Sequence, residues 1–304
     1  MILEENEKKI HALEEQLLTL DSESEEFHTV KKELDELKKD TYSNLSAWDR
    51  VCIARSDKRV KGKALVDALI TDFYELHGDQ LFSEDQSIYA GIGFLYDKPV
   101  TVLAQAKGSN TQENIKRNFG MTSPEGFRKT LRLAKEAEKF HRPIITIVDT
   151  SGAYPGKGAE ERGQARAIAT NLMEFSQLKT PVIAIVLSEG GSGGALALTV
   201  SDYIYMFENA VYSVLSPEGF ASILFKDTVK VNDAAEMMKM TSKDLVDEHI
   251  VDEIIKEPLG GIRHLSDSFI KNLKNSLYNK INELEALDEA KLLENRYNKY
   301  RNIK

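Results

Sequence analysis

Two short apolar runs constrain the fold most, because each is followed by a glycine-rich turn and then by a helical pattern. The runs are IITIVD (144–149) and VIAIVL (182–187), and their β-branched composition is typical of strands buried in a sheet. Further strand-like segments lie at 88–95, 100–106, 203–207 and 211–214. Helical patterns lie at 124–141 and 160–178. Strands that alternate with helices of this length predict βαβ units and an α/β fold.

The turn after the second run reads SEGGSGGALAL, in which Gly190, Gly191, Gly193 and Gly194 surround Ser192. Glycine lets the chain take a positive φ and lets a ligand approach the main chain, at a cost in backbone entropy. This composition favours a functional site at the junction of strand and helix. A crowded turn that merely needs small residues is the alternative.

The turn after the first run, DTSGAYPGKGAEERGQ (149–164), opens a helix in the same way. It resembles a phosphate loop, but the spacing from Gly152 to Gly156 is one residue short, and Gly158 stands where Ser or Thr should bind magnesium. ATP binding is therefore not expected. Both turns should expose N–H groups beside a helix N-terminus, where they favour an anion. Side by side, they predict an oxyanion hole for an enolate or a similar anion.

The second turn also matches G-x-S-x-G, the nucleophile elbow of α/β hydrolases, with Ser192 as the nucleophile. A hydrolase would need an acid and a histidine further along the chain. The candidates are Asp202, Asp227, His249 and His264. None of them is marked out by its surroundings, and His249 is typical of an ordinary surface or packing histidine. The hydrolase nevertheless stays open as the alternative function.

A basic cluster occurs in KGSNTQENIKRNFGM (107–121), which contains Lys107, Lys116 and Arg117. In a chain with an overall negative charge, such a cluster could steer an anionic substrate or the acidic surface of a carrier protein. A solvated helix face would have the same composition.

Composition excludes several classes of protein. The chain has 304 residues, with 40 Lys and Arg against 49 Asp and Glu, and a formal net charge of −9, which disfavours a nucleic-acid partner. Its lone cysteine, Cys52, excludes an intramolecular disulfide and a multi-cysteine zinc site, and we expect no metal in this chain. The N-terminus resembles no signal or transit peptide, and charges interrupt every apolar run too early for a membrane span. We therefore expect a cytoplasmic protein.

The N-terminal 40 residues differ from the rest of the chain. Apolar residues at helical spacing lie on both sides of the acidic break DSESEE, in which Ser22 and Glu25 form a possible capping box. This pattern predicts a hairpin of two amphipathic helices, which packs on the body, binds a partner or is simply solvated. A further helix is predicted at 63–76, and the tail beyond Gly261 is helical and charged. We expect a hairpin at 1–40, a catalytic domain at 41–264 and a helical extension at 265–304.

Several longer segments together resemble one family, the α subunit of bacterial-type acetyl-CoA carboxylase carboxyltransferase, from about Trp48 to His264. The segments are KRNFGM (116–121), PEGFRKTLRLAKEAEKF (124–140), PIITIVDTSGAYPGKGAEERGQ (143–164), SEGGSGGALAL (188–198), YSVLSPEGFASILFKD (212–227) and EPLGGIRH (257–264). The family-like helical hairpin precedes them.

The resemblance implies a crotonase-like (ClpP/crotonase) superhelix of repeated ββα units with an N-terminal helical hairpin and C-terminal helices. It implies transfer of the carboxyl group from carboxybiotin, held on a biotin carboxyl carrier protein, to acetyl-CoA, which gives malonyl-CoA for fatty acid synthesis. It also implies an α2β2 heterotetramer with a carboxyltransferase β subunit, which carries zinc and mainly binds the CoA ester. Biotin carboxylase completes the holoenzyme, and ATP is consumed by a different subunit.

The resemblance also assigns site residues. The paired glycine amides of the family fall on Gly193 and Gly194, which would form the oxyanion hole, while Ser192 would be a small filler and the biotin ureido anion the general base. Substrate-binding positions would be Gly190, Gly191, Gly152, Ala153, Lys116 and Arg117.

Three positions depart from the usual family pattern. Ser151 stands where the family usually has Pro, Gln80 stands where it has Arg, and QAKG (105–108) varies an HQKG-like segment. We expect changes of detail and the same function. A serine hydrolase labelled at Ser192 and a non-catalytic scaffold remain as alternatives of other classes.

Overall fold

The computed structural model describes residues 2–303 and contains one eight-stranded sheet. The strands are β1 (Thr71–Glu75), β2 (Ile88–Leu95), β3 (Lys98–Gln105), β4 (Ile144–Thr150), β5 (Val182–Gly191), β6 (Tyr203–Phe207), β7 (Val211–Ser213) and β8 (Glu253–Ile255). Their order in the sheet is β1-β2-β3-β4-β5-β6-β8, and β7 pairs with β5. The first three strands are antiparallel, and pairing is parallel from β3 onward. The predicted α/β fold is confirmed.

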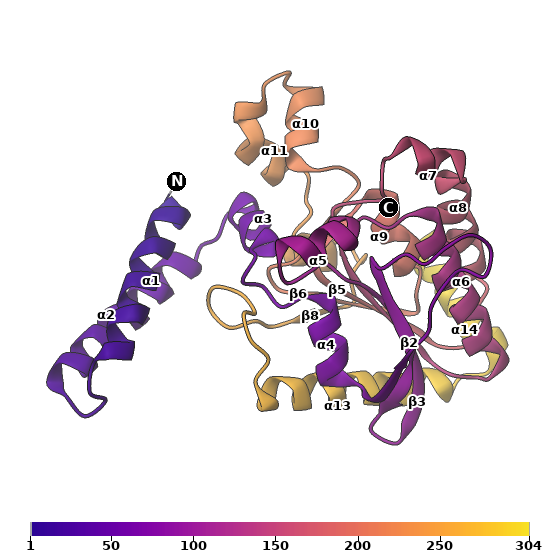
Figure 1. The fold of residues 1–304 in the computed structure, drawn as a ribbon, viewed down its shortest axis with the longest axis horizontal. Coiled ribbons are helices and arrows are strands. Elements are labelled where there is room, and N and C mark those ends of the chain that lie inside the picture. The colour runs from indigo at the N-terminus through magenta and orange to yellow at the C-terminus, as the bar shows by residue number, and fades with distance from the viewer. Residues whose placement is uncertain (1, 304) are drawn as a thin grey trace.

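Helices surround the sheet and extend from it (Figure 1). They are α1 (Ile2–Thr19), α2 (Glu25–Tyr42), α3 (Ala47–Arg55), α4 (Gly62–Leu69), α5 (Thr111–Lys116), α6 (Pro124–Lys139), α7 (Lys157–Glu161), α8 (Gln164–Phe175), α9 (Ser192–Thr199), α10 (Pro217–Leu224), α11 (Val231–Met237), α12 (Ser242–Asp247), α13 (Asp267–Glu285) and α14 (Glu289–Arg301), with 3₁₀ turns η1 (Asn118–Gly120) and η2 (Thr228–Lys230). None of these helices is long and apolar enough to cross a membrane.

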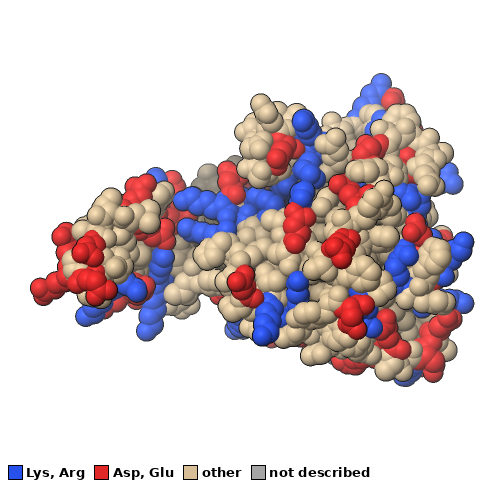
Figure 2. Space-filling view, turned by 60° about the horizontal axis from the view of Figure 1, so that its bottom comes forward, with Lys and Arg blue, Asp and Glu red and all other residues tan. Residues whose placement is uncertain are grey.

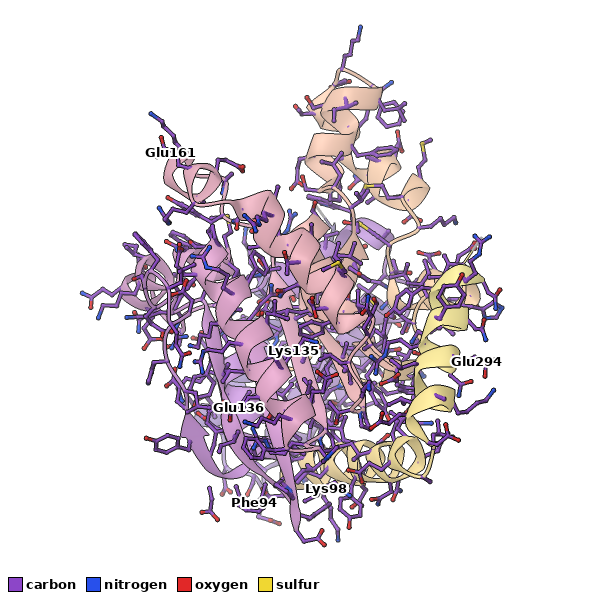
Figure 3. The ribbon with its side chains drawn as sticks, turned by 90° about the vertical axis from the view of Figure 1, so that its right-hand side faces the viewer. Phe94, Lys98, Lys135, Glu136, Glu161 and Glu294 are labelled. Carbon is purple, nitrogen blue, oxygen red and sulfur yellow. The ribbon has the colours of Figure 1, made fainter. Side chains whose placement is uncertain are left out.

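The core lies on both faces of the central strands, because β4 is buried along its whole length. One face packs against α6, α8 and α9 through Leu133, Phe175 and Leu198. Figure 3 shows α6, which carries Lys135 and Glu136, on this side of the molecule. The other face packs against α4 and α13 through Leu69 and Leu277. This three-layer arrangement holds the strand ends rigidly in place.

The C-terminal helices belong to the same core. Leu273, Leu277 and Ile281 of α13 lie in the main apolar cluster. Arg296 of α14 is 1% exposed and contacts both carboxylate oxygens of Asp202. It also donates to the carbonyl oxygens of residues 175, 178 and 180. The segment beyond 265 is therefore packed as part of the body.

Three local expectations were wrong. The helix predicted at 63–76 ends at Leu69, and Thr71–Glu75 forms β1, because this segment pairs with β2 at the sheet edge through an irregular register. The helix predicted at 160–178 is divided into α7 and α8, because Gly163 has a φ of 84° that a continuous helix does not allow. The cap of α2 is Ser24, whose hydroxyl accepts a hydrogen bond from the N–H of Phe27, and is not Ser22.

The predicted N-terminal hairpin is confirmed, and α1 and α2 project from the body (Figures 1 and 2). Ile10 and Leu34 are buried between the helices, and the same cluster reaches Ile53 of α3. At its base, Glu7 accepts hydrogen bonds from Tyr42 at 3.1 Å and from Arg263 at 3.0 Å. The hairpin therefore packs on the body along one edge, and binding of a partner by its remaining surface stays a prediction.

Candidate active site

The carboxyl ends of β4 and β5 bring two turns together. We call residues 150–153 the β4 turn and residues 190–194 the glycine turn. Thr150 and Gly190 are paired across the two strands, and the glycine turn leads directly into α9. The predicted strand, turn and helix, and the predicted neighbourhood of the two turns, are both confirmed. Figure 3 shows the opposite end of the sheet, where Phe94 and Lys98 mark the hairpin between β2 and β3.

The two turns touch through their main chains. A Cβ atom on Gly191 would lie 2.2 Å from the carbonyl oxygen of Ser151, and one on Gly194 would lie 2.5 Å from the nitrogen of Ala153. Glycine is therefore required at both positions by packing. Gly193 differs, because a Cβ atom there would meet only Ile168, at an ordinary 3.5 Å. Neither backbone packing nor a positive φ explains a glycine at position 193.

The glycine turn presents N–H groups at the N-terminus of α9. The N-cap residue is Gly191, which has no side chain to accept a hydrogen bond, and the first-turn N–H groups of a helix have no partner within the helix. No side chain of residues 2–303 accepts a hydrogen bond from Gly193 or Gly194. The helix dipole adds a partial positive charge at the same place. This end of α9 can therefore donate to an anion.

A cavity of about 260 Å³ lies beside the glycine turn. Its walls include Gly190, Gly191 and Ser192 on one side and apolar side chains from α3, β7, the segment before α10 and the segment before α12 on the other. The apolar side chains are Val51, Val211, Val214, Leu215 and Met240. Only Arg55 and Glu189 contribute charged side chains to the walls. The cavity suits a small molecule that has one polar edge and one apolar face.

A chain of ion pairs runs behind the turns. The Nζ atom of Lys107 lies 2.9 Å from Oδ1 of Asp149 and 3.0 Å from Oε2 of Glu189. Arg55 contacts the other oxygen of Glu189 at 2.7 Å and reaches Oε1 of Glu218, on α10, at 2.5 Å. The chain therefore connects the ends of β4 and β5 to the helix that flanks the cavity.

These contacts keep the buried groups charged. Burial by itself would lower the pKa of Lys107, but the negative charges of Asp149 and Glu189 outweigh burial and raise that pKa. Burial would raise the pKa of Glu189, but the charges of Lys107 and Arg55 outweigh it and lower that pKa. Both side chains are therefore ionised at neutral pH.

The structure does not bring Lys116 and Arg117 to the glycine turn. Lys116 lines a separate cavity of about 230 Å³, and Arg117 donates to the carbonyl oxygen of Gln86 at 2.8 Å. The same motif supports the site through Gly120, whose φ is 78°. A Cβ atom on Gly120 would lie 2.8 Å from Cγ of Lys107 and 3.0 Å from the carbonyl oxygen of Asp149, so this loop covers the Lys107 side chain.

The remaining predicted residues lie in the two turns. Gly152 has a φ of 151°, and a Cβ atom on it would meet no other atom within 4 Å, so its backbone conformation and not crowding favours glycine. Ala153 forms an isolated bridge with Thr122, which ties the β4 turn to the loop that follows η1. Both residues therefore border the glycine turn, as the sequence predicts.

The structure does not assemble a hydrolase triad. Ser192 has a φ of 51° and is exposed, and no hydrogen bond of its hydroxyl occurs among residues 2–303. Asp202 precedes β6 and His249 precedes β8, so both lie at the amino edge of the parallel strands, opposite Ser192. Asp227 caps the N–H of Val229 at 3.0 Å, and His264 is exposed. The hydrolase alternative is not supported.

Sequence reasoning missed most of the charged residues behind the turns. The sequence pattern places Asp149 and Glu189 only within glycine motifs and Lys107 only within a basic cluster. The available signal is positional: Asp149 and Glu189 lie near the ends of β4 and β5, and Lys107 lies two residues beyond the end of β3. No group of three or more His, Cys, Asp or Glu side chains in the described part of the chain is placed to hold a metal ion.

Comparisons with known proteins identify the family of the chain. A family model described as acetyl co-enzyme A carboxylase carboxyltransferase-like matches residues 2–304. The acetyl-coenzyme A carboxylase carboxyl transferase subunit alpha of Clostridium botulinum is 54% identical over 258 residues, which cover 85% of this chain and 94% of the relative. The subunit of that name from Alkaliphilus oremlandii is 47% identical over 307 residues, covering 98% and 97%.

Solved structures show a similar fold. A Pseudomonas malonate decarboxylase hetero-tetramer in complex with coenzyme A contains a chain with a TM-score of 0.60 and 15% identity, covering 77% of this chain and 92% of that one. Transcarboxylase 12S matches with a TM-score of 0.59 and 17% identity, covering 75% of this chain and 44% of that one. This chain therefore spans less than half of the transcarboxylase chain. The predicted crotonase-like architecture is confirmed.

Proposed function

The chain belongs to the family of acetyl-CoA carboxylase carboxyltransferase alpha subunits, and from this premise we propose that its glycine turn stabilises the anions formed during carboxyl transfer. The activity is that of the carboxyltransferase of acetyl-CoA carboxylase, which forms malonyl-CoA from acetyl-CoA. The observation that carries the proposal is the pair of N–H groups of Gly193 and Gly194, which open α9 beside the β4 turn and have no side-chain acceptor among residues 2–303.

The cavity beside the glycine turn fits the carboxybiotin that the family implies. The biotin ring has a polar ureido edge and an apolar sulfur-containing face. The cavity likewise has the glycine-turn residues Gly190, Gly191 and Ser192 on one side, next to the N-terminus of α9, and Val51, Leu215 and Met240 on the other. Carboxybiotin supplies the CO2, and the ureido group from which CO2 is released supplies a base.

The protein's own contribution is rigid donation of hydrogen bonds where negative charge develops. The N–H groups of Gly193 and Gly194 are held in place because Gly191 and Gly194 pack directly on the β4 turn. Removing one such donor typically lowers kcat by about 10²- to 10³-fold. This mechanism needs no side-chain nucleophile, and Ser192 serves as a small turn residue.

The proposed partners are a carboxyltransferase β subunit, in an α2β2 assembly, and a biotin carboxyl carrier protein, with biotin carboxylase in the holoenzyme. The name of the relatives, subunit alpha, implies a multi-subunit complex. The lobe of α10 and α11 stands off the body in Figure 1. Ile223 and Val229 in this lobe are 72% and 84% exposed, and Val214, in the segment that leads into it, is 81% exposed. Val214 also lines the cavity, and exposed apolar side chains of this size support a partner that covers them.

The reverse reaction tests this function. Malonyl-CoA-dependent carboxylation of free biotin is measured with the chain alone, with a β subunit, and with Gly193→Val or Ser192→Ala in the mixture. We expect activity only in the mixture, lost with valine and retained with Ser192→Ala, because valine puts a branched side chain beside the donors. Circular dichroism and gel filtration establish that each variant folds and assembles.

Two results would contradict the proposal. Full activity of the folded Gly193→Val mixture would remove the glycine turn from the mechanism. Ester hydrolysis by the chain alone, with covalent labelling by a fluorophosphonate that Ser192→Ala abolishes, would instead identify a serine hydrolase.

A further inference from the structure

We propose that Lys107 is a positioning residue for carboxyl transfer, because its ammonium group fixes the β4 turn against the glycine turn. We call Lys107, Asp149 and Glu189 the Lys107 clamp. The inference rests on the proposed function and assigns to that site a residue that does not itself contact substrate.

The clamp joins the two turns at the residues that immediately precede them. Asp149 directly precedes the β4 turn, and Glu189 directly precedes the glycine turn. The Lys107 ammonium lies 2.9 Å from the first carboxylate and 3.0 Å from the second. A single cation therefore links two neighbouring parallel strands at the place where both strands end.

The spacing of these strand ends sets the position of the anion donors. Gly191 and Gly194 are in van der Waals contact with the main chain of residues 151–153, with no room for a Cβ atom on either. A shift of the β4 turn must therefore move the N-terminus of α9 and the N–H groups of Gly193 and Gly194. Displacement of a catalytic group by about 1 Å can lower a rate by about 10²-fold.

The buried carboxylate of Asp149 depends on Lys107 for charge compensation. Its side chain is 1% exposed, and neither of its oxygens accepts a hydrogen bond among residues 2–303. The contact with Lys107 is thus an ion pair without hydrogen-bond geometry, whereas the contact of Lys107 with Glu189 is also a hydrogen bond. Lys107 provides the only salt bridge of Asp149 in the described chain.

Lys107 is placed to position and not to bind substrate. Its side chain is 16% exposed, the loop at Gly120 packs on its aliphatic part, and it is not among the residues that line the cavity. Arg55 holds the other oxygen of Glu189 at 2.7 Å and contacts Glu218. Glu189 is therefore fixed from both sides.

The test must distinguish a loss of positioning at the two turns from a loss of folding stability. Lys107→Met alone would leave the buried carboxylate of Asp149 unpaired and Glu189 with Arg55 as its remaining partner, and leaving a buried charge unpaired is strongly destabilising. The informative variant is the neutral triple substitution Lys107→Met, Asp149→Asn and Glu189→Gln, which keeps side-chain shape and removes all three charges. The matched control is Arg296→Met with Asp202→Asn, which neutralises a buried pair at the opposite edge of the sheet.

Each variant is combined with the β subunit and assayed for malonyl-CoA-dependent carboxylation of biotin below its unfolding temperature. For the triple variant we expect kcat to fall by about tenfold to a hundredfold, with the KM for malonyl-CoA changed by less than about threefold, since Lys107 and Asp149 do not line the cavity and Glu189→Gln keeps the shape of the one clamp residue that does. Lys107→Arg, which keeps a cation between the carboxylates, should recover part of kcat. The control should lose thermal stability and keep its kcat.

Three results would overturn the inference: a wild-type kcat in the folded triple variant, an equal fall of kcat in the control, or a triple variant that fails to fold. The last result would make the clamp a requirement of the fold and not a positioning device. An inactive wild-type mixture would instead contradict the proposed function itself.

Discussion

Nε2 of Gln105 donates a hydrogen bond to the carbonyl oxygen of Gly194 at 2.8 Å. This contact ties the end of β3 to the first turn of α9, on the helix that presents the anion donors. Gln105 is fully buried, and its Oε1 atom has no hydrogen-bond partner among residues 2–303. The amide of Gln105 therefore donates a hydrogen bond through Nε2, while its Oε1 atom accepts none in the described chain.

Gln105→Leu should lower activity with little change in stability. Leucine removes the bond to Gly194, but it also removes a buried oxygen without a partner, so the free energy of unfolding should change by less than about 1 kcal/mol. Biotin carboxylation with the β subunit should fall by about tenfold, because α9 loses one of its anchors. Gln105→His, which retains an N–H donor, is the control. Unchanged activity of the leucine variant would show that this bond is dispensable.

Alanine substitutions should divide the glycines into two classes. At Gly194 the new methyl group would meet main-chain atoms at 2.5 Å, whereas at Gly193 it would make an ordinary contact with Ile168 at 3.5 Å. Gly194→Ala should therefore destabilise the protein by about 1–3 kcal/mol, and Gly193→Ala by less than about 0.5 kcal/mol. Urea unfolding of the two variants measures the difference, and equal losses would contradict the packing that separates them.

The strand, turn and helix around Ser192 could be predicted because the signal is local. An apolar β-branched run, a group of glycines and a helical pattern follow one another within residues 182–198. The same local reasoning failed at 63–76, where apolar spacing favoured one helix. There the pairing of β1 with β2, which depends on residues 88–95, decides the conformation.

The Lys107 clamp could not be predicted from local pattern. Lys107, Asp149 and Glu189 are about forty residues apart in the chain, and they meet only because β3, β4 and β5 are neighbours in the sheet. Their spacing in the sequence has no period that a helix or strand would impose. Charged residues at the carboxyl ends of successive buried strands are the one signal available before a structure.

Replacing Arg296, which ties α14 to Asp202, should destabilise the whole protein. Arg296 and Asp202 form a buried ion pair at 2.7 Å, with side chains 0% and 3% exposed. Arg296→Met should lower the free energy of unfolding by about 3–5 kcal/mol, because it leaves the Asp202 charge unpaired. Adding Asp202→Asn should restore part of this loss. Lys291→Met, in an exposed pair with Glu294, should cost less than about 1 kcal/mol. Equal losses of stability at the two sites would contradict a larger contribution from the buried pair of Arg296 and Asp202 than from the exposed pair.

The contribution of the Glu189 carboxylate to the stability of the folded protein should depend on pH only at acidic pH. The pKa of Glu189 is lowered in the folded protein, so its stabilising effect is present above the ordinary glutamate pKa of about 4.3. That effect is lost as the pH falls through the lower folded value. The pKa of Lys107 is raised, so its own effect is lost only as the pH rises past about 10.4. The difference in melting temperature between wild type and Glu189→Gln should be constant from about pH 6 to about pH 9 and should shrink below about pH 4. A change in that difference between about pH 6 and about pH 8 would contradict the lowered pKa of Glu189 and the raised pKa of Lys107.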